Sequence, residues 1–209
     1  MSLKQKVIAI DGPSASGKGT VASRVAEALG FLYLDSGALY RLTALYAQKQ
    51  NVAWTDEDAV STLAETLPAQ FEGSVVLLNG EDVSEQIRTE AIGMGASAVA
   101  QLPKVRTALL QRQRDFLNEK GLVADGRDIG SVIFPNAALK IFLTASANVR
   151  AQRRAKQLGI PCEGVAFERI LSDIGARDEA DRRRPVAPLK QLPDALLLDT
   201  DNLSIEEAV

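Results

Sequence analysis

Short apolar runs alternate along the chain with longer stretches that mix apolar and polar residues. Each run is bounded by glycine, proline or polar residues, which is typical of strands buried in a parallel sheet. The alternation of strands with helical stretches predicts a mostly parallel sheet with helices on both faces. The predicted strands are Val7–Asp11, Phe31–Asp35, Leu122–Asp125, Leu139–Leu143 and Ala195–Leu198.

The middle of the chain follows a different pattern. An apolar run from Ser74 to Leu78 leads into Asn79-Gly80 and then Glu81 to Val83. Because Asn-Gly is the favoured type I′ turn, we expect a small antiparallel hairpin inserted into the alternating fold. Helices are expected after it, from about Thr89 to Gln101 and from Pro103 to Lys120. An insertion at this point could hold a second substrate.

Nine residues that follow the first predicted strand form a candidate phosphate-binding loop. The pattern is G-x-x-x-x-G-K, and a helix to about Leu29 comes next. Backbone N–H groups of such a loop surround phosphate oxygens, the helix N-terminus adds its dipole, and Lys18 reaches the β- and γ-phosphates. A glycine-rich turn with a chance lysine is disfavoured because strand, spacing and helix agree. The loop consists of Gly12, Pro13, Ser14, Ala15, Ser16, Gly17, Lys18, Gly19 and Thr20.

The composition limits the kinds of partner and of reaction that the chain can have. The 209 residues fit one domain, 46% of them are hydrophobic, and the net charge of −3 creates no general attraction for nucleic acid. No apolar run approaches the roughly 20 residues of a membrane span. One cysteine, Cys162, excludes an internal disulfide, and the absence of histidine removes the commonest general base. Phosphoryl transfer to a phosphate acceptor tolerates that absence, since positioning and charge stabilisation do most of the work.

Two groups of charged residues lie where such chemistry needs them. Three predicted strands end in aspartate, at Asp11, Asp35 and Asp125, and ligands in open α/β sheets sit beyond these strand ends. Each aspartate taken alone is better explained as a helix cap or turn former. Arginines gather at 150–154 and 177–184. They suit phosphate recognition, or else a solvated helix face with ion pairs to neighbouring acidic residues.

Several segments together resemble bacterial cytidylate kinases. The GKGT ending of the loop is favoured by nucleoside monophosphate kinases, whereas the DGFPR segment of adenylate kinases and the NKxD motif of GTPases are absent. The resemblance implies MgATP-dependent phosphorylation of CMP and dCMP. It rests on the loop GPSASGKGT, Asp35–Arg41 (DSGALYR), Asp125–Gly130 (DGRDIG), Arg177–Leu189 (RDEADRRRPVAPL) and the run from Asp194 to Thr200.

The family's fold is an α/β P-loop kinase core, with a central five-stranded parallel sheet flanked by helices. A small inserted NMP-binding subdomain and a helical lid complete the single domain over residues 1–209. The resemblance implies a core at about 1–65 and 120–209, an acceptor-binding insertion at about 66–119 and a lid at about 150–168. The family usually continues beyond Val209, and we expect this difference to affect packing rather than catalytic groups.

The resemblance also assigns the donor side of the site. The loop would bind ATP together with Arg153 and Arg154, which the family places, with Arg150, in the lid. Thr20 is the first choice for a Mg²⁺ ligand, and Asp125 the second. The catalytic groups implied are Lys18, Arg41, Arg127 and Arg177.

Cytosine presents an amino group beside two acceptors, so its pocket needs a carboxylate and donors. The resemblance gives these parts to Asp128, Arg106 and Ser97. On residues alone, Ser97 is better explained as a small helix-packing residue, whereas Arg106 and Arg127 are equally well explained as surface arginines or as binding residues. Arg41 and Arg127 would clamp the acceptor phosphate with help from Ser36. The remaining CMP-binding residues implied are Arg177, Asp181 and Arg184, with Asp181 accepting a ribose hydroxyl.

Other functions remain in view. A P-loop kinase of another acceptor, such as UMP, shikimate or dephospho-coenzyme A, would share the loop. It would not need the Asp128 carboxylate to face an amino group. A non-catalytic nucleotide-binding regulator would bind ATP without turnover and would not need residues that read a second base. We expect a cytoplasmic monomer whose partners are ATP and CMP or dCMP, with Mg²⁺ as cofactor and without nucleic acid or membrane partners.

Overall fold

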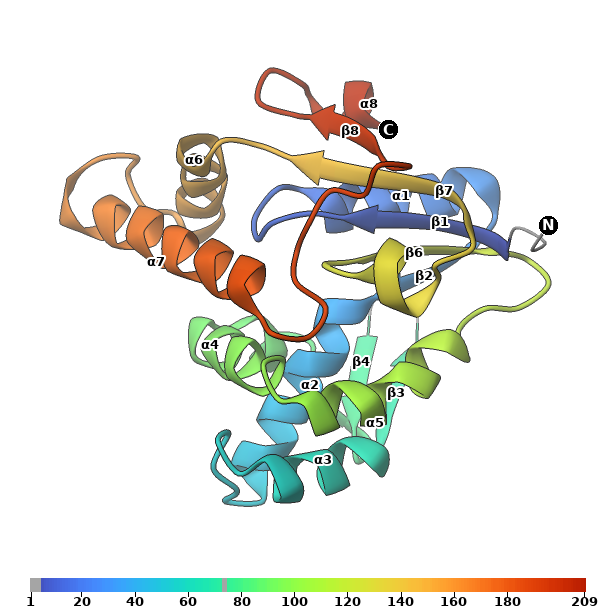
Figure 1. Ribbon diagram of the computed structural model, residues 1–209. Coiled ribbons are helices and arrows are strands. Elements are labelled where there is room, and N and C mark those ends of the chain that lie inside the picture. Colours follow the sequence, from blue (N-terminus) through green and yellow to red (C-terminus); the bar gives the residue numbers. More distant parts are fainter. Residues whose placement is uncertain (1–4, 73–74) are drawn as a thin grey trace. The chain divides into compact units, whose positions relative to one another are not determined.

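The structure is a computed structural model that describes residues 5–72 and 75–209. The chain separates into two compact units. The first contains Met1–Leu34 and Phe116–Val209, and the second contains Asp35–Asp115. Each unit has its own sheet and helices, coloured along the sequence in Figure 1.

The first unit is built on a five-stranded sheet. Strand β1 pairs in parallel with both β6 and β7, and β7 pairs in parallel with β8. The predicted parallel sheet is therefore confirmed, with bounds that differ by one or two residues. In spatial order the strands are β2 (Leu32–Asp35), β6 (Leu122–Gly126), β1 (Gln5–Asp11), β7 (Ala137–Thr144) and β8 (Leu196–Asp199).

Helix α1 (Lys18–Leu29) packs on this sheet because its apolar face meets the buried central strands. Ile10 of β1, Val123 of β6 and Leu143 of β7 form one apolar cluster with Val21 and Ala22 of the helix. Every residue of β6 is buried, as expected of a central strand covered on both faces. The unit's other helices are α6 (Ala147–Leu158), α7 (Gly164–Arg183) and α8 (Ile205–Ala208), together with a π-helical turn at Ile129–Ile133.

The second unit combines helices with a small antiparallel sheet. The hairpin predicted around Asn79-Gly80 is confirmed, since both residues have positive φ and β4 pairs with β5 across them. Ser74 lies outside the described residues. The elements are α2 (Ser36–Lys49), α3 (Glu57–Glu65), β3 (Ala69–Glu72), β4 (Val75–Leu78), β5 (Glu81–Asp82), a 3₁₀ turn at Gln86–Arg88, α4 (Glu90–Val99) and α5 (Pro103–Arg114).

The predicted helix from Pro103 to Lys120 is wrong at its end. Helix α5 stops at Arg114, and Asn118 then accepts a hydrogen bond from the backbone of Lys120 at 2.9 Å. Gly121 follows with φ of 103°, next to the ring of Phe31. The chain therefore leaves the helix early because it must turn before it enters β6.

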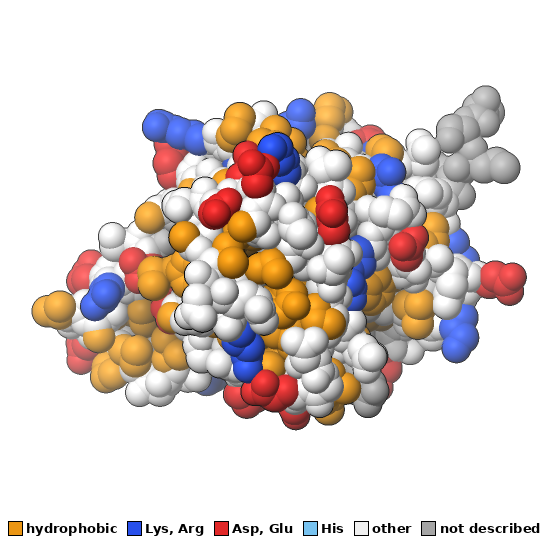
Figure 2. All heavy atoms as spheres, turned by 90° about the horizontal axis from the view of Figure 1, so that it is seen from below, with side chains coloured by type: hydrophobic (Ala, Val, Ile, Leu, Met, Phe, Trp, Pro, Cys, Tyr) orange, Lys and Arg blue, Asp and Glu red, His pale blue; other side chains and the backbone are white. Residues whose placement is uncertain are grey.

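On the face shown in Figure 2, side chains of one charge do not gather into a single patch. Lysine and arginine side chains are interspersed there with acidic and apolar ones. Among the residues that the structure describes, none of the helices is both long enough and apolar enough to span a bilayer.

Helix α4 approaches its neighbours closely at Gly95. A Cβ atom at this position would lie 2.5 Å from the ring of Trp54, whose Nε1 donates to the Ala44 carbonyl of α2 at 2.9 Å. We therefore expect Gly95→Ala to lower the free energy of unfolding by about 1–3 kcal/mol, because the indole cannot move without losing its hydrogen bond. Urea unfolding followed by circular dichroism measures this change.

The matched control is Gly175→Ala on α7, where a Cβ atom would lie more than 4 Å from every described residue outside its own stretch of helix. This change should raise the free energy of unfolding by up to about 1 kcal/mol, since alanine is the better helix former. Equal effects at the two positions would contradict the packing explanation.

Candidate functional site

The phosphate loop runs from the end of β1 to the start of α1, as predicted. Gly12 passes so close to β7 that a Cβ atom there would lie 2.0 Å from the Leu143 carbonyl oxygen. Gly17 caps α1 with φ of 90°, and Ala15 also has a positive φ, of 56°. The loop thus needs glycine at both ends, for a close approach at Gly12 and for a left-handed backbone at Gly17.

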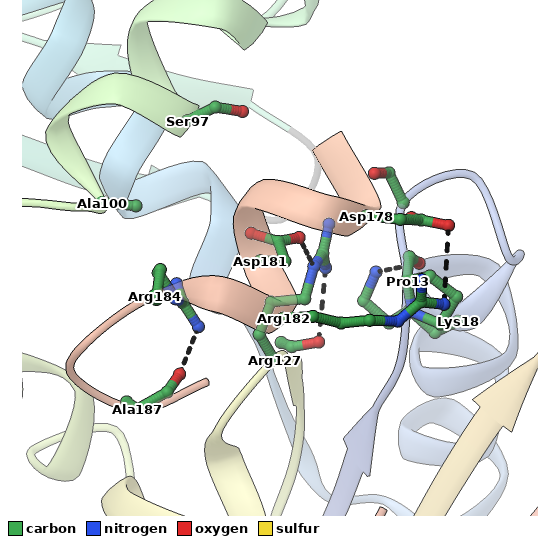
Figure 3. A network of polar contacts seen from close by, with 12 residues as sticks. Pro13, Lys18, Ser97, Ala100, Arg127, Asp178, Asp181, Arg182, Arg184 and Ala187 are labelled. Carbon is green, nitrogen blue, oxygen red and sulfur yellow. Dashed lines mark hydrogen bonds and ion pairs between the residues drawn. The ribbon is translucent and has the colours of Figure 1, made fainter. Parts of the chain in front are cut away.

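Lys18 lies in the first turn of α1 with only 8% of its surface exposed. Its Nζ donates to the Pro13 carbonyl at 3.2 Å, so the side chain reaches back to the start of the loop (Figure 3). The hydroxyl groups of Ser14 and Ser16 are buried without a hydrogen-bond partner among the described residues. The loop therefore gathers a cation, two hydroxyls and the N-terminus of a helix.

A cleft of about 430 Å³ lies beside the loop, within the same unit. Its lining includes Gly17 and Thr20, Arg153 and Arg154 of α6, and residues between Thr200 and Ala208. Arg153 donates to the Ser16 carbonyl at 3.1 Å and to the Thr200 carbonyl at 2.6 Å. Both arginines assigned to ATP on sequence grounds are therefore at the wall of this cleft.

The three strand-end aspartates have three different roles. Asp35 caps α2 by accepting from the Ala38 N–H at 3.0 Å, which confirms the cap interpretation for this residue. Asp125 is buried and accepts from the Tyr33 hydroxyl at 2.7 Å. Asp11 is buried and accepts from two backbone N–H groups, those of Ile129 and Gly130, each at 2.8 Å.

Asp11 fixes the segment that follows Asp128. That segment is the π-helical turn at Ile129–Ile133, and Asp128 stands directly before it with a buried side chain. Burial raises the pKa of Asp11 to about 6, although its two backbone hydrogen bonds oppose the rise; the charge of Asp128 adds to it and that of Lys18 opposes it. Sequence reasoning flagged Asp11 as a strand-end residue but missed this contact.

Arg127 and Asp181 are brought together from distant parts of the sequence. Arg127 Nε donates to Asp181 Oδ2 at 2.6 Å, and the two side chains point toward each other in Figure 3. Burial disfavours the charged guanidinium, but the nearby carboxylates of Asp181, Asp125 and Asp11 outweigh it and raise the pKa of Arg127. This arginine stays cationic.

The other predicted residues of the first unit lie on or after α7. Arg177 and Asp181 are on the helix, and Arg184 follows its end. Arg184 is buried and donates to the Ala187 carbonyl at 2.5 Å. The Leu189 N–H donates to the Asp181 carbonyl at 2.9 Å, so the segment after α7 folds back on the helix.

The predicted residues of the second unit come from three helices. Ser36 begins α2, is buried, and donates to Gln113 Oε1 at 2.7 Å. Arg41, also on α2, donates to the Ile87 carbonyl at 2.7 Å. Sequence reasoning gave no signal for Gln113, because a polar residue inside a helical pattern does not reveal its partner.

Ser97 and Arg106 both form hydrogen bonds to backbone carbonyls of the second unit. The Ser97 hydroxyl donates to the Gly93 carbonyl one turn back in α4, at 3.1 Å, an ordinary hydrogen bond for a helical serine. Arg106 on α5 is buried, lies 5.4 Å from the ring centre of Tyr40, and donates to the Ala100 carbonyl at 3.2 Å. The cation–π contact shows that Arg106 is not an ordinary solvated arginine.

Among the described residues, no group of three or more Asp, Glu or Cys side chains is arranged to hold a metal ion. Two oxygen groups could nevertheless bind a metal ion here, the Thr20 hydroxyl at the end of the loop and the Asp125 carboxylate near it. A Cβ atom at Gly19 would lie 3.3 Å from the Tyr33 hydroxyl and 3.9 Å from Asp125 Oδ1. A side chain at position 19, where many phosphate loops have serine or threonine, would therefore crowd the Tyr33 hydroxyl.

The parallel sheet, the glycine-capped helix and the buried loop lysine define a P-loop nucleotide-binding protein. The sequence model of the family described as "Cytidylate kinase" matches residues 8–209. The chain belongs to the cytidylate kinase family, and it is an enzyme of the kinase class.

Relatives from three bacteria carry the name "Cytidylate kinase". The protein of Neisseria meningitidis serogroup C is 79% identical over 206 residues, which cover 99% of this chain and 94% of the relative. That of Chromobacterium violaceum is 60% identical, covering 97% and 91%. That of Pseudomonas syringae pv. tomato is 54% identical, covering 100% and 94%.

A solved structure, described as "Crystal structure of TT1252 from Thermus thermophilus", has a TM-score of 0.46 and 19% identity, covering 99% of this chain and 95% of that chain. This likeness is too low to bear on fold or function.

The pKa of Asp11 leads to a pH dependence of stability. The native carboxyl titrates near pH 6 and the unfolded one near 3.8, so the native state binds more protons between these values. The contribution of Asp11 is complete below about pH 3.8 and is lost as the pH rises through 6. Between pH 5 and pH 7.5 the loss amounts to roughly 1–1.5 kcal/mol.

The measurement is urea unfolding of the natural protein and of Asp11→Asn at several pH values. The advantage in unfolding free energy of the natural protein over the variant should shrink as the pH rises from 5 to 7.5. A difference that stays constant over this range would contradict the raised pKa.

Proposed function

We propose that the protein transfers the γ-phosphoryl group of ATP to CMP or dCMP, giving CDP or dCDP and ADP. The observation that carries the proposal is the family match over residues 8–209. This match includes both the unit with the phosphate loop and the unit with Ser36, Arg41, Ser97 and Arg106.

The donor half of the reaction is assigned to the first unit. Backbone N–H groups of the loop and the N-terminus of α1 bind the phosphates of ATP, and Lys18 neutralises charge on the β- and γ-phosphates. The cleft beside the loop takes the nucleoside part, with Arg153 and Arg154 at its wall. In support, the cleft and the loop share Gly17 and Thr20.

Kinases of this type use Mg²⁺, which would offset the negative charge of the ATP phosphates when bound here. The donors near the loop fit this ion, because Mg²⁺ prefers oxygen ligands and usually keeps several waters. Thr20 is the protein ligand that we propose, with Asp125 as a partner through water. The Tyr33 hydroxyl keeps one carboxylate oxygen of Asp125 engaged, at 2.7 Å.

The acceptor base is assigned by its hydrogen-bonding groups. The Asp128 carboxylate accepts from the exocyclic amine of cytosine, and Arg106 and Ser97 donate to its acceptors. Asp11 contributes indirectly, because its two backbone hydrogen bonds fix the chain next to Asp128. Uracil has a carbonyl where cytosine has the amine, so the same carboxylate would repel it.

The acceptor phosphate is assigned to cationic side chains. Arg41 and Arg127 clamp it, Ser36 helps to place the nucleotide, and Arg177 and Arg184 add further charge. Asp181 accepts a hydrogen bond from a ribose hydroxyl. The hydrogen bond between Asp181 and Arg127 supports the grouping, since it already holds one clamp in a fixed direction.

Catalysis then needs no proton-accepting histidine, and the chain has none. The acceptor is an anionic phosphate, so holding it in line with the γ-phosphate supplies much of the rate. Lys18, Arg41, Arg127 and Arg177 stabilise the charge that spreads over the transferred group. We propose that the enzyme acts as a cytoplasmic monomer.

A panel of acceptors tests the proposed activity. With MgATP, we expect kcat/KM for CMP or dCMP to exceed that for UMP, AMP or shikimate by at least about 100-fold, since a mismatched polar edge leaves buried groups unpaired. A coupled assay of ADP formation measures each acceptor. Equal or better use of another acceptor would identify a different P-loop kinase, and ATP binding without turnover would indicate a regulator.

Lys18→Ala is the control for this panel. It should lose transfer to every acceptor, because the lysine acts on the charge of the transferred group, and circular dichroism should show the fold retained. Near-normal turnover by this variant would point to a contaminating kinase or would refute the role of Lys18.

Asp128→Ala tests the reading of the base. The change should lower kcat/KM for CMP by about 100-fold or more while the dissociation constant of ADP, measured by calorimetry, changes less than about threefold. Equal losses for both nucleotides would instead indicate that Asp128 has a structural role.

A further inference from the structure

A buried ion pair joins helices α6 and α7. Arg150 donates from Nη1 and Nη2 to the two carboxylate oxygens of Asp178, at 3.0 and 2.5 Å. The two side chains are only 4% and 6% exposed. This two-pronged geometry requires the planar fork of an arginine, which lysine does not have.

The same guanidinium also holds two backbone carbonyl groups. Nη1 donates to the Ser14 carbonyl of the phosphate loop at 3.1 Å, and Nε donates to the Ala145 carbonyl after β7 at 2.9 Å. A carbonyl held in this way fixes the plane of its peptide, and hence the direction of the N–H group in that plane. Arg150 thus orients part of the loop whose N–H groups face phosphate.

A second arginine of α6 acts on the loop in the same manner. Arg153, three residues further along one helix face, donates to the Ser16 carbonyl at 3.1 Å. Both loop carbonyls are therefore engaged by guanidinium groups and cannot turn toward a bound phosphate, which they would repel. Arg150 also binds a residue of α7, Asp178.

Stability alone explains this pair poorly. Removing two charges from water is costly, and a buried ion pair is often no more stabilising than well-packed apolar side chains. The residues next to Asp178 on α7 are more informative about the role of the pair. On α7, Arg177 directly precedes Asp178, and Asp181 follows about one turn later.

We propose that Arg150 is a positioning residue. It fixes the Ser14 carbonyl of the donor loop and, through Asp178, the turn of α7 that carries Arg177 and Asp181. The assignment of that turn to the acceptor rests on the proposed function, whereas the loop contact does not. Loss of the pair should therefore impair the handling of ATP and of CMP together.

Three variants separate positioning from stability. Arg150→Lys keeps the charge but lacks the fork. The double variant R150M/D178L replaces the pair with apolar side chains of similar length. The control is Arg183→Met on α7, because Arg183 is 81% exposed and its ion pair with Glu179 lies at the surface. For each protein we would measure steady-state kinetics, ADP binding by calorimetry, and the melting temperature.

We expect the control to stay within about twofold of the natural protein, because exposed ion pairs contribute little. Arg150→Lys should lower kcat/KM for both ATP and CMP by about 100-fold and weaken ADP binding by about tenfold, since small displacements of binding groups are costly. The double variant should show the same losses although its melting temperature stays close to that of the natural protein.

Natural kinetics and ADP binding in either folded Arg150 variant would overturn the proposal and leave the pair a stabilising contact only. If the double variant does not fold, Arg150→Lys decides. Weakened ADP binding with unchanged CMP kinetics would refute the link to α7. If the natural protein itself does not phosphorylate CMP, the proposed function fails, and ADP binding by Arg150→Lys still tests the loop contact.

Discussion

We propose that the function of this protein depends on a short loop whose backbone N–H groups stay open toward phosphate. The surrounding elements help to impose that shape. Gly12 lets the chain pass directly against β7, and Gly17 turns it into α1. Arg150 and Arg153 then hold two of the loop's carbonyls from α6. The loop is thus shaped by its neighbours, and the rest of the site is built around it.

Several arginines of this chain are paired with carboxylates, and the chain must bind two anionic nucleotides. Cationic groups that act on phosphate must stay charged and fixed while partly out of water. Asp181 does this for Arg127, and neighbouring carboxylates keep that guanidinium cationic despite burial. Asp178 fixes the direction of Arg150, which in turn holds a carbonyl of the loop. The acidic residues among the arginines therefore direct the arginines rather than simply balance their charge.

Local patterns predicted the strands, the phosphate loop and the Asn79-Gly80 hairpin, because each depends on residues adjacent in sequence. Contacts between distant residues could not be found in this way. Nothing local shows that the Tyr33 hydroxyl meets Asp125 beside Gly19, or that Arg150 is buried against Asp178. The end of α5 was misjudged for a related reason, since the turn into β6 overrides helix propensity. The resemblance to cytidylate kinases supplied the roles of residues that patterns alone leave ambiguous, Ser97 above all.

We propose that one chain carries two separate nucleotide sites, with the loop as the donor half. Backbone amide shifts in ¹H–¹⁵N NMR spectra, recorded with MgADP alone and then with CMP alone, test this most directly. MgADP should shift the amides of the loop from Gly12 to Thr20, apart from Pro13, which has no N–H. CMP should shift a different set that includes Asp128, Ser97 and Arg106. Two separate sites would be ruled out if the loop amides did not respond to MgADP, or if CMP and MgADP shifted the same amides.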